Sequence, residues 1–106
     1  MKILLDECVP QQLRHALSNH EVATVPRMGW VGGSNGNLLI AAEQAGFELF
    51  VIADKNLRYQ QNLSTRHIAI LELWTNHRPT LERHFGEIHA AAERIKRGEY
   101  SALEAP

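Results

Sequence analysis

The chain has 106 residues, with 11 Lys and Arg against 12 Asp and Glu, so its length predicts a single domain and its formal net charge is −1. A content of 44% hydrophobic and 22% charged residues excludes a disordered or fibrous chain, and the near-zero charge excludes a broadly basic, non-specific DNA-binding protein. One cysteine allows no internal disulfide, and no apolar run approaches the roughly 20 residues that span a bilayer, so we expect a cytoplasmic protein without membrane contact.

The first half of the chain alternates short apolar runs with helical patterns. Residues 2–5 predict a strand, and Pro10 suits the first turn of a following helix. Residues 21–25 predict a second strand, and the glycine-rich segment 26–37 predicts a loop. Ser34 or Asn35 is expected to cap a helix that ends at Gly46.

The second half continues the same alternation. Residues 49–53 and 67–73 predict two further strands, separated by a short polar helix or turn. One long helix is expected from Pro79 to residue 97, because apolar side chains recur there at spacings of four and three. Residues 1–98 therefore predict one domain, and residues 99–106 predict a loose tail.

Strands that alternate with helices predict an α/β fold with a mostly parallel, four-stranded sheet between two helical layers. We expect the second strand at one edge, followed by the first, third and fourth. Asp6 and Asp54 directly follow the first and third apolar runs, so this order brings both to the carboxyl edge of the sheet. Ligands bind at that edge in open parallel sheets.

Two carboxylates at one edge repel each other unless a cation lies between them. Mg²⁺ or Mn²⁺, which prefer oxygen ligands, would satisfy Asp6 and Asp54, with Glu7 as a further candidate ligand. The alternative is that each Asp only caps the following turn. Cys8 is expected to be a small buried apolar side chain, and the six histidines, which match no metal-binding template, to be surface or capping residues.

Several of these segments together resemble the small bacterial PIN-like proteins, which are relatives of VapC-type toxin nucleases. The resemblance rests on MKILLDE at the start, on NGNLLIAAEQAGFELFVIAD, and on DKNLRYQQNL, and it covers roughly residues 1–98. It implies a three-layer PIN-like fold and metal-dependent endonucleolytic cleavage of RNA. It also implies a small cognate antitoxin protein as partner.

Carried over residue by residue, the resemblance makes Asp6 and Asp54 catalytic metal ligands. Asn37 and Asn56 stand where such proteins commonly have further acidic residues, and asparagine supplies an oxygen ligand but no charge and no general base. The site is therefore weakened, absent, or completed by Glu7 or Asn76. The candidate substrate-binding residues are Lys55, Arg58, Gln60, Gln61, Asn35 and Trp30. Trp30 either stacks on a base or covers the core.

Two other functions stay open. A PIN-like fold with a degraded metal site would serve as a protein-interaction module, and the apolar stripe of the last helix would form either core or a homodimer seam. A receiver-like phosphoacceptor domain would use Asp54, but it requires a Lys after a fifth strand. Basic residues outnumber acidic ones over 55–97, with Arg83, Arg94 and Arg97 on one predicted helical stripe, so a local basic rim is compatible with RNA binding.

Overall fold

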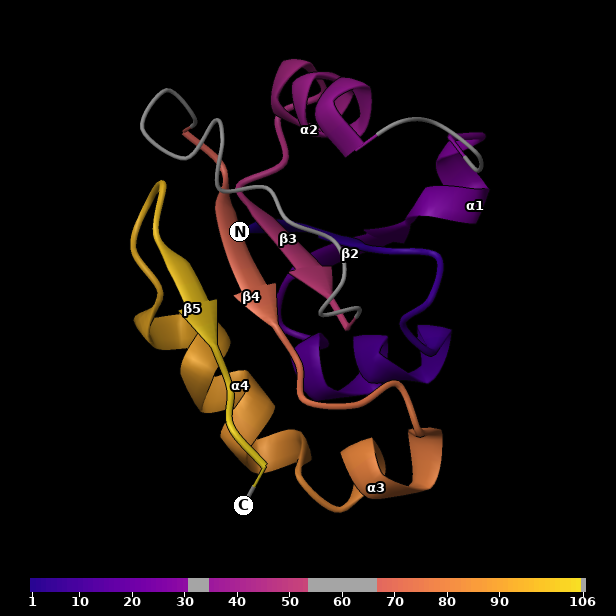
Figure 1. Ribbon diagram of the computed structural model, residues 1–106, viewed down its shortest axis with the longest axis vertical. Helices are drawn as coiled ribbons and strands as arrows, with labels where there is room; N and C mark the ends of the chain where they lie inside the picture. Colours follow the sequence, from indigo (N-terminus) through magenta and orange to yellow (C-terminus); the bar gives the residue numbers. More distant parts are fainter. Residues whose placement is uncertain (31–34, 54–66, 106) are drawn as a thin grey trace.

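A computed structural model describes residues 1–30, 35–53 and 67–105, without the side chains of residues 35–37. Its centre is a five-stranded, all-parallel sheet in the order β2-β1-β3-β4-β5 (Figure 1). The strands are β1 (Lys2–Leu5), β2 (Glu21–Thr24), β3 (Leu49–Ile52), β4 (Ala69–Glu72) and β5 (Tyr100–Ala102). The predicted α/β class and the predicted order of the first four strands are confirmed.

The fifth strand corrects two expectations, a four-stranded sheet and a loose tail from residue 99. Tyr100 lies in register with Ile70, and the Ile70 amide donates to the Glu99 carbonyl at 2.8 Å. Gly98, at φ 77°, occupies the left-handed region that glycine adopts without strain and that a turn into β5 can use. Three residues carry too little periodicity to be recognised as a strand from sequence.

Helices cover both faces of the sheet, because successive side chains of each buried strand point to opposite sides. One face packs against η1 (Gln11–Leu17), α3 (Arg78–Glu82) and α4 (Phe85–Arg94), and the other against α1 (Val25–Met28) and α2 (Asn35–Gln44). The first core includes Leu5, Val51 and Ile88. The second includes Phe50, which is fully buried, and Ile52.

Two local elements differ from their prediction. The helix after Pro10 is a 3₁₀-helix, η1. The predicted loop from residue 26 begins inside α1, where the Thr24 hydroxyl accepts the Arg27 amide and Gly29 ends the helix at φ 77°. By contrast, α2 begins at Asn35, and Gly46, at φ 89°, follows its end, as the sequence predicts.

The predicted long helix over residues 79–97 is instead two helices, α3 and α4. Its break lies at His84, whose φ of −125° and ψ of 22° are not helical. The His84 ring packs edge-on against Trp74, with centroids 5.4 Å apart, and its Nδ1 lies 2.8 Å from Glu87 Oε1. Leu81 and Ile88 are buried in the core, so the apolar stripe is core rather than a free seam. Because of the break, Arg83, Arg94 and Arg97 do not form a stripe on one helix.

Candidate functional site

The carboxyl edge of the sheet between β1 and β3 is the point where the chain reverses its winding direction. From β1 the chain passes to β2 on one side, and β3 and β4 follow on the other. In open parallel sheets such a switch point leaves a crevice at the strand ends, where ligands bind. Asp6 is the residue that directly follows β1 at this point.

Asp6 is held by both its backbone and its side chain. Its amide donates to the Val51 carbonyl at 3.0 Å, which extends the β1–β3 ladder by one residue, and its carbonyl accepts the Val9 amide at 3.0 Å. Its Oδ2 accepts a hydrogen bond from the Cys8 thiol at 3.3 Å. Because only 4% of the residue is exposed, its carboxylate is a buried polar group in a fixed position.

Asp54, the expected partner of Asp6, lies outside the described residues. The strand adjacency on which the prediction depended is nevertheless present, since Leu5 pairs with Val51. Also outside the described residues are Lys55, Asn56, Arg58, Gln60 and Gln61. Asn35 and Asn37 lie in the first turn of α2, but their side chains are not described.

Glu72 is a buried carboxylate near this edge that the sequence analysis missed. It is the last residue of β4, pairs with Ile52 of β3, and is 7% exposed. The Tyr100 hydroxyl donates to its Oε1. With Asp6 beside Ile52, the register puts Asp6, Ile52 and Glu72 in one row across three strands, so the two acidic Cα atoms lie about 10 Å apart. Glu72 is the one charged residue of an apolar run, and that contrast was the available signal.

The other described candidates are not gathered around Asp6. Glu7 and Asn76 are exposed. Trp30 packs edge-on against Phe47, with ring centroids 6.2 Å apart, and Phe47 precedes β3 at the opposite end of the sheet. This contact favours Trp30 as a cover of the core over Trp30 as a base-stacking residue. Cys8 is half-buried against the first core, close to the expectation for it.

A pocket of about 470 Å³ lies at the amino-terminal end of the sheet, away from Asp6. Its walls include Glu43, His67, Lys96 and Arg97. The Glu43 carboxylate is already engaged by the backbone amides of His67 and Ile68, at 2.6 and 2.9 Å. The pocket contains no predicted site residue, so the buried carboxylates at the carboxyl edge are the better candidate site.

The donor chemistry at the carboxyl edge fits a hard cation. Within the described part of the chain, this edge supplies the two buried carboxylates Asp6 and Glu72, and Mg²⁺ and Mn²⁺ bind such oxygen ligands. The described residues contain one group of three close His, Cys, Asp or Glu donors, and it lies elsewhere: His20, His89 and Glu93. Its donors are mainly imidazoles, which do not suit Mg²⁺.

Comparison with known proteins yields no relative: no protein-family model, no curated protein and no solved structure matches this chain. Within the described residues, no helix combines the length and apolarity needed to cross a membrane.

Proposed function

We propose that the protein is a metal-dependent ribonuclease of the PIN-like class and the toxin of a toxin–antitoxin pair. The observation that carries the proposal is Asp6, a buried carboxylate fixed at the switch point of a parallel sheet, with β3 and the residues leading to Asp54 beside it. Asp6 and Asp54 would hold Mg²⁺ or Mn²⁺. Glu72 would add a further carboxylate at this edge, where Asn37 and Asn56 bring no charge.

Each group has a defined part in this reaction. Asp6 and Asp54 would hold the ion, and Asn37 and Asn56 would orient its ligands through neutral oxygens. When bound, Mg²⁺ or Mn²⁺ would supply polarisation of the scissile phosphate and a lowered pKa of the attacking water. Lys55 and Arg58 neutralise the RNA backbone, and the Gln60 and Gln61 amides hydrogen-bond to it.

Cleavage of single-stranded RNA by the purified protein tests the proposal. With Mn²⁺ we expect cleavage that a chelator abolishes, and the variants Asp6→Asn and Asp54→Asn should lose it, because the amide keeps the shape and removes the ligand charge. Glu21→Gln, which changes an exposed carboxylate at the start of β2, is the matched control and should keep full activity. Cleavage that survives either Asp variant or the chelator contradicts the nuclease function.

The protein-interaction alternative is separated by a second measurement on the same variants. Metal titration that gives binding to the original chain, no binding to Asp6→Asn, and no RNA cleavage would identify a metal site without nuclease activity. Co-purification with a small protein encoded beside it would then favour the interaction module. Size-exclusion chromatography of the protein alone reports whether it forms the homodimer.

One observation supports the receiver-like alternative and another argues against it. The strand order β2-β1-β3-β4-β5 is the order of that doubly wound class. That class, however, requires a Lys at the end of the fifth strand, whereas Leu103 directly follows β5. Failure of acetyl phosphate with Mg²⁺ to label Asp54 excludes this alternative.

A further inference from the structure

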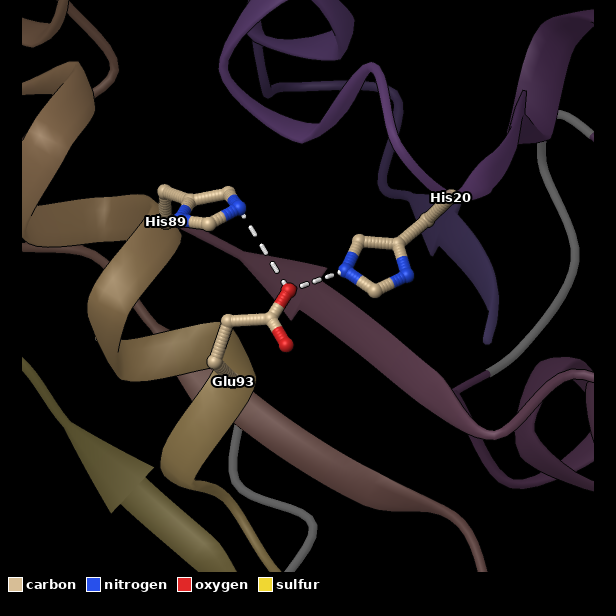
Figure 2. Close-up of side chains that lie close together, drawn as sticks. All are labelled: His20, His89 and Glu93. Atoms are coloured by element: carbon tan, nitrogen blue, oxygen red, sulfur yellow. Dashed lines mark hydrogen bonds and ion pairs between the residues drawn. The ribbon is translucent and has the colours of Figure 1, made fainter.

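Two elements far apart in the chain bring His20, His89 and Glu93 together (Figure 2). His89 and Glu93 are one turn apart on α4, and His20 directly precedes β2. His20 Nε2 lies 2.5 Å from Glu93 Oε1, and His89 Nε2 lies 3.4 Å from the same oxygen. One donor atom from each residue falls within 4.8 Å of the others.

This cluster is separate from the proposed nuclease site. His20 precedes β2, whose first residue, Glu21, pairs with Lys2 at the amino-terminal end of the sheet. Asp6 lies at the other end of β1, and four residues of strand separate the two ends by about 13 Å. The proposed reaction uses none of the three residues.

The donor set matches the preferences of Zn²⁺. Zinc binds imidazole nitrogens and carboxylate oxygens at about 2.0–2.2 Å in a tetrahedron, so its neighbouring ligand atoms lie about 3.4 Å apart. The His89–Glu93 separation of 3.4 Å already has this value. The distance between His20 Nε2 and Glu93 Oε1, now 2.5 Å, needs to increase by less than 1 Å to reach about the same value. Glu93 can move, because its side chain is 43% exposed.

A neighbouring amide orients one of the donors. The Asn19 side-chain nitrogen donates to Glu93 Oε1 at 3.2 Å, and the second lone pair of this oxygen stays available to a metal ion. The Asn19 oxygen lies 3.2 Å from His89 Nε2, and zinc binding at Nε2 would replace this contact. The His20 side chain is only 9% exposed and therefore held in place, whereas His89, at 42%, is accessible to an incoming ion.

We propose that His20, His89 and Glu93 form a Zn²⁺ site that joins the turn before β2 to α4. The three side chains supply three ligands and water completes the tetrahedron. Because both elements contribute ligands, bound zinc holds η1 and β2 against α4 and stabilises the folded chain.

Calorimetric titration of the full-length, chelator-treated protein with ZnCl₂ tests this site. We expect one zinc ion per chain and a rise in Tm on binding. His89→Ala and Glu93→Gln should each weaken zinc binding by more than the about 10- to 100-fold typical of losing an outer partner, because each removes a ligand. Both residues are partly exposed, so these variants should fold.

Two control variants make the result specific. His15→Ala removes an exposed histidine of η1 and should leave zinc affinity unchanged. Asp6→Asn should also leave it unchanged, which separates this site from the proposed nuclease site. No zinc binding by the original chain, or equal affinity in His89→Ala, Glu93→Gln and His15→Ala, overturns the proposal. The absorption spectrum of the Co²⁺ form should show tetrahedral coordination, and an octahedral spectrum would also overturn it.

Discussion

At the scale of single residues, the two buried carboxylates of the described chain each have a hydrogen-bond donor. The Cys8 thiol donates to Asp6 and the Tyr100 hydroxyl donates to Glu72. A buried carboxylate without such donors would cost several kcal/mol, so these contacts help to keep the charges inside the fold. Asp6 was predicted because it ends an apolar run. Glu72 interrupts an apolar run, which was a signal for it, but its hydrogen bond to Tyr100, 28 residues further along the chain, is tertiary and not readable from the sequence.

Glu93 predicts a pH dependence of stability in the metal-free protein. The hydrogen bond from His20, and then that from Asn19, lowers the pKa of the Glu93 carboxyl below its ordinary value of 4.5. A pKa lowered by folding stabilises the folded state above the unfolded pKa, and this contribution disappears as the pH falls through the folded pKa. Glu93→Gln should therefore destabilise the chain at neutral pH and lose this effect in acid.

Urea unfolding at about pH 7 and about pH 3, with a chelator present, measures the difference in free energy of unfolding between the original chain and Glu93→Gln. Glu104→Gln, which changes an exposed carboxylate after β5, serves as the control. An equal effect of Glu93→Gln at both pH values would contradict the assigned role of the His20 contact.

At the scale of elements, two glycines with open surroundings predict opposite effects of the same substitution. A Cβ at Gly29 or at Gly86 would meet no atom within 4 Å. Gly29 has a φ of 77° and ends α1, so Gly29→Ala should destabilise by about 1–2 kcal/mol through backbone strain. Gly86 is the second residue of α4 and has no positive φ, so Gly86→Ala should stabilise by at most about 0.5–1 kcal/mol.

Chemical denaturation of both variants beside the original chain measures these free energies of unfolding. Each substitution is the control for the other, since both add one methyl group to open space. Effects of the same sign would show that backbone conformation does not decide the outcome.

How well each element could be predicted depends on whether its own residues carry the pattern or a distant contact determines it. The strands at 2–5, 49–52 and 69–72 were predictable because they are buried on both faces and read as apolar runs. The break at His84 was not, because the apolar spacing continues through it and the contact with Trp74 is tertiary. The His89–Glu93 pair could have been recognised from its spacing, but its partner His20 depends on how α4 packs against η1 and β2.

At the scale of the whole molecule, the two proposed sites lie at opposite ends of one sheet. Asp6 follows the carboxyl end of β1, and His20 precedes the amino end of β2. Alternation of strands and helices was sufficient to predict the layers and the carboxyl-edge position. Predicting the cluster of His20, His89 and Glu93 required knowing that α4 lies in a crossover from β4 to β5. This crossover was not predicted because β5 itself was missed.

Strand β5 also predicts how the chain tolerates shortening. A protein that ends at residue 98 loses β5 and its backbone bonds to β4, including the Leu103 amide bond to the Glu72 carbonyl. Light scattering should show that this protein aggregates, whereas one that ends at Leu103 stays dispersed. Equal behaviour of the two shortened proteins would contradict the protective role of β5.

The reason lies in what β5 covers. All four residues of β4 are buried, and the strand carries mainly apolar side chains. An uncovered strand of this kind offers unpaired amides and carbonyls to the same edge of another copy, which is the route to intermolecular sheets and fibres. A protease that cuts before β5 would thus expose the backbone edge of β4 to other copies. We therefore expect β5 to protect β4 from self-association.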